Sequence, residues 1–336
     1  MVAKIAGGGM GTIYLGRARD PKGIERVVAI KVTRQDVSLV HYGGDLASEA
    51  KILSRLTHPN IIRTHESGTT ADQQFIAMEL LVGRTLLDVW DACASKGLAL
   101  RLDLSAWIAA RVAHGLHYAH ELTDESGAPL HVIHRDVNPS NIFLTFDGEV
   151  KLFDFGLANV GDRSKNSGVV HGKLAYLSPE QIMQFPMDRR SDLYTLGTTL
   201  WEMTTMRRLF KRATDVETVK AVRGAVIPDA RKIVNGYPDE LWRIVNKALE
   251  RNRDNRYATA AELAEDLDAF VGTTGDADLH LLISAILDSL FPEDRARQMG
   301  WLRRTSVLPT GDPRPTQPPL PSRRPPGQDE APARKK

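Results

Sequence analysis

The segment from residue 134 to residue 141 constrains this chain most strongly. It places two polar side chains, Asp136 and Asn141, five positions apart. Pro139 lies between them, and proline disrupts a regular helix because it has no backbone N–H and its ring clashes with the preceding turn. The segment is therefore expected to be irregular, with a carboxylate and an amide close to one another.

A β-hairpin is expected directly after this segment. Two short apolar runs, at residues 142–144 and 150–152, are separated by Asp147-Gly148. Asp-Gly between apolar runs is a strong hairpin signal, because both residues tolerate the positive φ angles of a tight turn. The hairpin should return the chain so that Asp154 lies beside Asn141, where a carboxylate and an amide oxygen could share a metal ion.

The N-terminal region contains the parts of a phosphate-binding site. Glycines cluster at residues 7–11 between apolar runs, and a glycine turn can bring backbone N–H groups close to phosphate oxygens. The apolar run at residues 27–32 predicts a strand whose one cation, Lys31, needs a partner if it is buried. Helical spacing over residues 45–56 puts Glu49 on the inward side, so a Lys31–Glu49 ion pair is expected. An edge-strand lysine that reaches solvent is the alternative.

Three motifs resemble those of the eukaryotic-type protein kinases, and in particular bacterial serine/threonine kinases with a Gly-Gly-Met-Gly loop. His-Arg-Asp-Val-Asn-Pro-Ser-Asn at 134–141 is similar to the catalytic loop, Asp-Phe-Gly at 154–156 to the magnesium motif, and Ser-Pro-Glu at 178–180 to the motif that closes the activation segment. The resemblance covers about residues 1–271. It implies an α+β, two-lobed protein kinase fold, with a small β-rich N-lobe at about 1–80 and a larger helical C-lobe at about 81–271.

The resemblance assigns the chemistry to five polar side chains. Asp136 would accept the proton of the acceptor hydroxyl. Lys31, oriented by Glu49, would bind the phosphates of ATP. Asn141 and Asp154 would bind Mg²⁺, with Mn²⁺ as an alternative ion. Each of these residues is therefore a predicted catalytic or metal-binding residue.

The resemblance also implies an adenine slot. Met78 would be the gatekeeper residue at the back of this slot, and the stretch from Glu79 to Leu81 would be the hinge whose backbone hydrogen-bonds adenine. The other predicted nucleotide contacts come from the glycine loop and the apolar walls of the slot, namely Ile5, Gly8, Gly9, Gly11, Ile13, Ala29 and Phe143. Taken singly, these apolar residues would be interpreted as core.

The helical half carries expected structural and regulatory contacts. By the same resemblance, Asp192 holds the backbone of the catalytic loop and Glu180 pairs with Arg256. Residues 159–173 suit an activation segment, and Arg135 next to the catalytic aspartate accompanies control by phosphorylation of that segment. Candidate phosphosites are Ser164 and Ser167, with two solvated loop serines as the alternative reading.

Four positions depart from the family pattern. Ala6 replaces the first loop glycine, and Met1 lies so close to the loop that the first strand is short or its start is missing. Asn138 replaces the lysine that usually follows the catalytic aspartate by two residues, and Lys173 replaces a threonine of the activation segment. These last two positions approach one another in the family. Lys173 is therefore expected to supply the cation that position 138 has lost.

Net charge, cysteine count and the length of apolar runs limit the remaining functional classes. A net charge of +2 gives no reason to expect nucleic-acid binding, and the single cysteine, Cys93, excludes an internal disulfide and is expected to be buried on a helix. No apolar run reaches the roughly 20 residues that span a bilayer, so no membrane association and a cytoplasmic location are expected.

The C-terminal extension, residues 272–308, is predicted to form two helices separated at Pro292, which should pack on the C-lobe or carry a partner contact. Residues 309–336 form a proline-rich tail expected to be disordered, with a tail-docking partner as an alternative.

These observations favour an ATP-dependent serine/threonine protein kinase. Its substrates would be Ser and Thr hydroxyls of proteins, and autophosphorylation and a role in bacterial signalling are expected. The alternative is a pseudokinase-like signalling scaffold with weak or no phosphotransfer. The altered catalytic loop and the long tail favour the scaffold, whereas the presence of all five polar side chains favours the enzyme.

Overall fold

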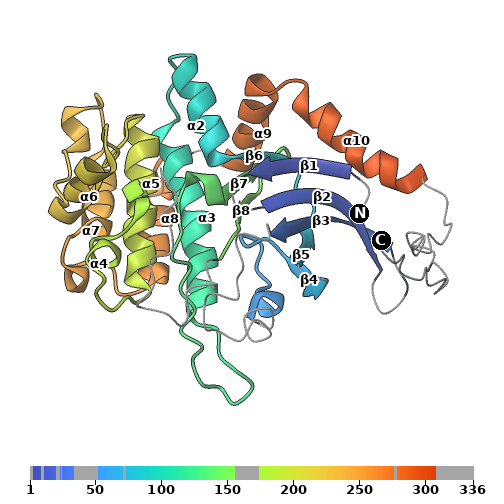
Figure 1. The fold of residues 1–336 in the computed structure, drawn as a ribbon. Coiled ribbons are helices and arrows are strands. Elements are labelled where there is room, and N and C mark those ends of the chain that lie inside the picture. The colour runs from blue at the N-terminus through green and yellow to red at the C-terminus, as the bar shows by residue number, and fades with distance from the viewer. Residues whose placement is uncertain are drawn as a thin grey trace, which may run out of the picture.

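The computed structural model describes residues 3–8, 11–19, 23, 25–33, 52–70, 73–155, 174–275 and 278–307. In these ranges a five-stranded sheet lies on one side of the molecule and a helical half on the other (Figure 1). A small three-stranded sheet lies between them, with α9 of the C-terminal extension above it, and in this view α10 lies above β1 of the five-stranded sheet (Figure 1).

The five-stranded sheet has the order β1-β2-β3-β5-β4, and every neighbouring pair is antiparallel. Within the glycine cluster, Gly8 at the end of β1 pairs with Gly11 at the start of β2. Leu15 and Val28 are each 1% exposed, and the register pairs Leu15 with Ala29 and Gly16 with Val28. The strands are β1 (Ala3–Gly8), β2 (Gly11–Arg19), β3 (Glu25–Thr33), β4 (Thr64–Thr70) and β5 (Gln73–Glu79).

The small sheet has the order β6-β7-β8 and contains the expected hairpin. Ile142 pairs with Leu152, and Gly148 in the turn has a φ of 85°, a conformation that favours glycine. The strands are β6 (Gly83–Thr85), β7 (Ile142–Thr145) and β8 (Val150–Leu152). The hairpin prediction is confirmed.

The helical half is built around α3, whose apolar stripe of Ile108, Val112, Leu116 and Ala119 is fully buried. It packs against α5 and α8. The helices of this half are α2 (Leu86–Ser95), α3 (Leu102–His120), α4 (Pro179–Ile182), α5 (Arg190–Thr205), α6 (Asp215–Gly224), α7 (Asp239–Ala248) and α8 (Ala260–Thr273). Short 3₁₀ turns are η2 (Pro139–Asn141), η4 (Leu174–Tyr176), η5 (Ala230–Lys232) and η6 (Arg253–Asn255).

The C-terminal extension forms the two predicted helices, α9 (Leu279–Leu290) and α10 (Asp294–Val307). In Figure 1 they lie at the upper edge of the molecule, beside α2 and above the small sheet. Contacts of α9 with α2, α3 and β7 confirm that this part of the extension packs on the kinase-like half.

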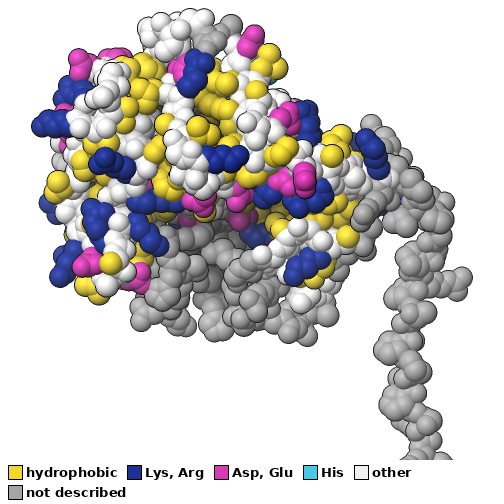
Figure 2. All heavy atoms as spheres, turned by 90° about the horizontal axis from the view of Figure 1, so that it is seen from above, with side chains coloured by type: hydrophobic (Ala, Val, Ile, Leu, Met, Phe, Trp, Pro, Cys, Tyr) yellow, Lys and Arg dark blue, Asp and Glu magenta, His cyan; other side chains and the backbone are white. Residues whose placement is uncertain are grey.

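Three further expectations concern the whole molecule. Cys93 is 3% exposed on α2, and burial raises the pKa of its thiol. Over the face seen from above, basic and acidic side chains are interspersed rather than separated by sign (Figure 2). Among the described residues, no helix combines the length and the apolar character needed to cross a bilayer.

Candidate active site

The catalytic-loop segment brings Asp136 and Asn141 into direct contact. The Asn141 side-chain nitrogen donates to Oδ2 of Asp136 over 2.9 Å and to its backbone oxygen over 2.8 Å. The expectation that Pro139 excludes a helix was wrong in one respect, because Pro139–Asn141 form a single 3₁₀ turn. Proline at the first position of a helical turn is well tolerated, since its fixed φ suits that position and no N–H is needed there.

Asn138 contacts the same carboxylate from the other side. This side chain is 2% exposed and donates to Oδ1 of Asp136 over 2.8 Å and to its backbone oxygen over 2.9 Å. Its own oxygen accepts from the backbone N–H of Ser140 over 2.9 Å, which caps the 3₁₀ turn. Both carboxylate oxygens of Asp136 are thus hydrogen-bonded to amide side chains. Asn138, which the sequence showed only as a replacement of the usual lysine, therefore has defined hydrogen bonds within the catalytic loop.

The β7–β8 hairpin places Asp154 as predicted. The backbone N–H of Phe153 donates to the backbone oxygen of Asn141 over 3.0 Å, so the residue before Asp154 is tied to the end of the catalytic loop. Asp154 itself has a φ of 60°. That conformation is unfavourable for a residue with a side chain, and surrounding contacts must hold it.

Lys31 lies against Asp154. Its ammonium nitrogen is 2.6 Å from each carboxylate oxygen of Asp154, and the two side chains are 18% and 32% exposed. A partner for the strand lysine was expected, and the structure provides this one. The predicted partner Glu49 lies outside the described residues.

Asp192, at the start of α5, anchors the catalytic loop from beneath. It accepts from the backbone N–H groups of His134 and Arg135 over 2.8 Å each, and it contacts the His120 ring nitrogen at 2.8 Å. Burial alone would raise the pKa of the Asp192 carboxyl. The hydrogen bond and charge of His120, together with the backbone donors, outweigh burial, so the net effect is a lowered pKa. The predicted role of Asp192 is confirmed.

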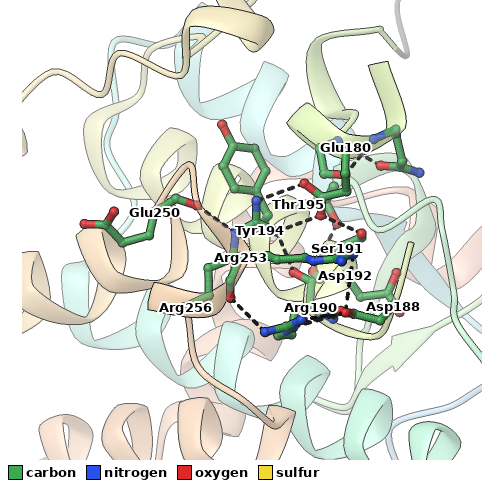
Figure 3. Close-up of polar contacts among 12 residues, drawn as sticks. Glu180, Asp188, Arg190, Ser191, Asp192, Tyr194, Thr195, Glu250, Arg253 and Arg256 are labelled. Atoms are coloured by element: carbon green, nitrogen blue, oxygen red, sulfur yellow. Dashed lines mark hydrogen bonds and ion pairs between the residues drawn. The ribbon is translucent and has the colours of Figure 1, made fainter. Parts of the chain in front are cut away.

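The Glu180–Arg256 pair closes the other side of this region. Arg256 donates to both carboxylate oxygens of Glu180, over 2.7 and 2.9 Å, and Figure 3 shows the two side chains facing one another beside Tyr194. Burial opposes ionisation of Glu180, yet the Arg256 contact prevails and lowers its pKa. The neighbouring Gln181 donates to the backbone oxygen of Arg135 over 2.9 Å. The predicted ion pair is confirmed, and this region is linked to the catalytic loop.

The predicted nucleotide contacts lie on both sheets. On the larger sheet Ala29 and Met78 are paired neighbours, each 7% exposed, and Ile13 pairs with Lys31. Glu79 ends β5, with its backbone N–H donating to the Arg63 oxygen over 2.9 Å. The other predicted contacts are placed on β1 (Ile5 and Gly8), at the start of β2 (Gly11), just after β5 (Leu81) and on β7 (Phe143).

The oxygen donors beside Asp136 fit a hard cation such as Mg²⁺. Because the Asn141 nitrogen donates to Asp136, the Asn141 side-chain oxygen is left without a hydrogen-bond partner among the described residues. Asp154 already faces a cation, the Lys31 ammonium. Mg²⁺ typically takes one or two protein oxygens and completes its shell with phosphate and water. No group of three or more His, Cys, Asp or Glu suited to a metal occurs in the described ranges.

Some predicted residues cannot be placed, and some contacts were not predicted. Gly9, Glu49, Ser164, Ser167 and Lys173 lie outside the described residues. The contacts of Asn138 with Asp136, of His120 with Asp192, and of Gln181 with Arg135 were missed. All three depend on side-chain directions in tight turns or between distant helices, for which the linear sequence has no periodic signal.

Comparison with known proteins identifies the family. The family model described as "Protein kinase domain" matches residues 1–267. The tyrosine-protein kinase MasK of Myxococcus xanthus is 33% identical over 311 residues, which is 92% of this chain and 48% of that protein. The probable serine/threonine-protein kinase CPE1738 of Clostridium perfringens is 35% identical over 265 residues, covering 78% of this chain and 36% of that protein. The serine/threonine-protein kinase PknL of Mycobacterium tuberculosis is 32% identical over 275 residues, covering 80% of this chain and 64% of that protein.

A solved structure agrees on the fold. The crystal structure of the Mycobacterium tuberculosis PknI kinase domain superposes with a TM-score of 0.59 at 23% identity and covers 80% of this chain and 94% of that one. The chain spans only 36% to 64% of the length of the three curated relatives. The family match and the shared arrangement of a β-rich lobe and a helical lobe nevertheless lead to one conclusion: this chain belongs to the protein kinase family and has its two-lobed fold.

Proposed function

We propose that this chain is an ATP-dependent serine/threonine protein kinase that transfers the γ-phosphoryl group to hydroxyls of protein substrates, including its own. One observation carries the proposal: Asp136, Asn141, Asp154 and Lys31 form a connected group, linked by hydrogen bonds and by the short Asn141–Phe153 backbone contact. Phosphoryl transfer depends mainly on such positioning and on charge stabilisation. A signalling role in the bacterial cytoplasm, where ATP and magnesium are available, belongs to the same proposal.

Each side chain of the group has one task in this proposal. Lys31 and the backbone N–H groups of the glycine turn bind the phosphates. Asn141 and Asp154 would hold magnesium, which would supply positive charge to offset the negative charge that develops on the transferring phosphate. Asp136 accepts the proton of the attacking hydroxyl, and the amides of Asn138 and Asn141 fix the direction of its carboxylate.

The class of acceptor residue has two candidates, because relatives of two named classes are similar to this chain. MasK is named a tyrosine kinase and aligns over 92% of the chain, whereas CPE1738 and PknL are named serine/threonine kinases. Tyrosine transfer is therefore the second candidate function. We favour serine and threonine because the resemblance of the catalytic and glycine loops is to kinases of that class.

Autophosphorylation tests the proposal directly. The full chain is incubated with labelled ATP and magnesium, with an Asp136→Ala chain as the blank, and hydrolysed for phosphoamino-acid analysis. Label on serine or threonine that is absent from the blank is the expected result, and mass spectrometry then reports whether Ser164 or Ser167 carries it. Label confined to tyrosine would show that the acceptor is tyrosine, while the assignment as a protein kinase would stand. ATP binding without any transfer would contradict an enzymatic role.

Lys173 provides a separate expected result. If its ammonium reaches the transferring phosphate in place of the lysine absent at position 138, Lys173→Ala should lower kcat by roughly ten- to a hundredfold while the KM for ATP changes little. A second variant, Lys173→Ala combined with Asn138→Lys, should recover part of the lost turnover. Steady-state kinetics on a peptide acceptor measure both. An unchanged kcat in Lys173→Ala would refute the compensation.

A further inference from the structure

The C-terminal extension is docked through an apolar face and a close backbone contact. Leu279, Ile283 and Leu287 of α9 are each at most 3% exposed, and α9 contacts α2, α3 and β7. At the turn of the β7–β8 hairpin, an added Cβ on Gly148 would lie 2.2 Å from the backbone oxygen of His280. The extension is thus fitted to this surface without space between the two backbones.

The second helix of the extension binds the strand that follows the predicted hinge. The Gln298 side chain accepts from the backbone N–H of Gly83 over 2.8 Å and donates to the backbone oxygen of Gly83 over 3.1 Å. Gln298 is 5% exposed, so both bonds are shielded from water. Because Gln298 bonds both the N–H and the carbonyl oxygen of Gly83, the backbone of Gly83 is held in one position and orientation.

A partly buried ion pair lies one residue further on. Arg84 donates to Oδ2 of Asp294 through Nε over 2.6 Å and also through its terminal nitrogen. Asp294 is 7% exposed, and the Arg84 guanidinium lies 4.9 Å from the centre of the Phe291 ring. A paired, partly desolvated arginine with a flat aromatic neighbour has little freedom to move.

The extension also holds the hairpin opposite this strand. Ser284 donates to the backbone oxygen of Phe146 over 2.6 Å, and Arg295 contacts Asp147 at 3.0 Å. The N–H of Phe146 in turn donates to the backbone oxygen of Val82 over 3.0 Å. Since β7 also carries Phe143, the extension supports both the end of the hinge and the strand that provides one predicted adenine contact.

We propose that Gln298 and Asp294 are positioning residues for nucleotide binding, acting through Gly83 and Arg84. The predicted hinge, Glu79–Leu81, is tied at its first end by the backbone contact of Glu79 with Arg63, and Gly83 follows its last residue by two positions. Gln298 therefore fixes the second end of the hinge. Hydrogen bonding of adenine to a short backbone segment requires that segment to be preorganised. This inference rests on the proposed kinase function.

The similarity to one relative continues into the extension. The family match ends at residue 267, before α9 begins. The alignment with MasK spans 92% of this chain, more than the matched domain can contain, so it must continue into the extension. The alignments with CPE1738 and PknL span 78% and 80%, about the length of the domain alone.

Nucleotide affinity and turnover, measured separately on the full chain, test the proposal. Gln298→Ala removes both bonds to Gly83 and should raise the KM for ATP and the Kd for ADP by roughly tenfold, while kcat stays within about twofold. Asp294→Asn weakens the contact with Arg84 and should raise both constants by a smaller factor. Met299→Ala, which truncates an exposed side chain next to Gln298 on the same helix, is the matched control and should change neither constant.

The possible outcomes separate this inference from the proposed function. Assays are run well below the thermal midpoint of each variant, so that the folded fraction is equal. Parallel increases in KM and in the Kd for ADP, with kcat retained, support the inference. Unchanged affinity in Gln298→Ala, or a loss of kcat at unchanged ADP affinity, overturns it while the kinase assignment stands. If the unaltered chain neither binds ADP nor transfers phosphate, both fail.

Discussion

Replacing Asp154 by Asn is expected to lower kcat by roughly a thousandfold. The substitution keeps the size of the side chain but removes the negative charge that faces Lys31 at 2.6 Å and that would bind magnesium in the proposed mechanism. A metal ion on a transferring phosphoryl group contributes several kcal/mol, and each 1.4 kcal/mol or so is a tenfold change in rate. The rate of transfer to a peptide, measured over a range of magnesium concentrations, gives the effect.

Nucleotide binding without metal distinguishes this loss from misfolding. In excess chelator the affinity of Asp154→Asn for ADP should be equal to or tighter than that of the unaltered chain, because a carboxylate that repels phosphate has been removed. Glu149, an exposed acid on the same hairpin whose side chain is 58% exposed, provides the control, and Glu149→Gln should behave like the unaltered protein. Turnover of Asp154→Asn within tenfold of normal would mean that Asp154 does not hold the metal.

The second large effect concerns stability. Asp192→Ala should reduce the free energy of unfolding by about 3–5 kcal/mol, the usual cost of removing one partner from a buried hydrogen-bonded charge pair. The substitution leaves the N–H groups of His134 and Arg135 and the ring of His120 without their acceptor, at a site where Asp192 is 1% exposed. Urea unfolding followed by tryptophan fluorescence measures the change. Glu240→Gln, at an exposed ion pair with Arg243, should leave the midpoint nearly unchanged.

The pH dependence of that stability has a definite sign. The pKa of Asp192 is lowered in the folded protein from an ordinary value of 3.8, so the folded state favours the charged form. Its contribution is therefore complete above the ordinary value and decreases as the pH falls through the lower, folded pKa. The difference in unfolding free energy between the unaltered chain and Asp192→Ala should be constant near neutral pH and shrink on strong acidification. A difference that grows on acidification would contradict the charged state assigned to Asp192.

Local signals in the sequence predicted much of the fold. The Asp147-Gly148 hairpin and the two helices of the C-terminal extension depend on the φ angles of turn residues or on the periodicity of neighbouring residues, and both were found. The contacts of Asp192 with the catalytic loop and of Glu180 with Arg256 were predicted from motifs whose spacing is shared by the family. Where pattern and motif agree, the prediction was correct.

Contacts that depend on three-dimensional direction were not predicted. Pro139 was read as excluding a helix, but as the first residue of a 3₁₀ turn it allows one, and that turn aims Asn138 at Asp136. Charge reasoning required a partner for Lys31 and predicted Glu49, which lies outside the described residues, whereas the described contact is with Asp154. The Gln298–Gly83 contact joins a neutral amide to a backbone 215 positions away, which no local pattern reports.

The Arg84–Asp294 pair has a consequence for the evolution of related kinases. The two residues are 210 positions apart, and Asp294 is 7% exposed, so a change of charge at position 84 removes one of the two arginines, Arg84 and Arg297, that pair with this buried carboxylate. Kinases that possess this extension should therefore substitute both positions together, for example by exchanging the two charges or by replacing both with apolar residues. In kinases whose chains end after the helix equivalent to α8, the residue at position 84 should vary independently. Covariation of two distant columns would then identify, from sequences alone, which members of the family carry a docked extension.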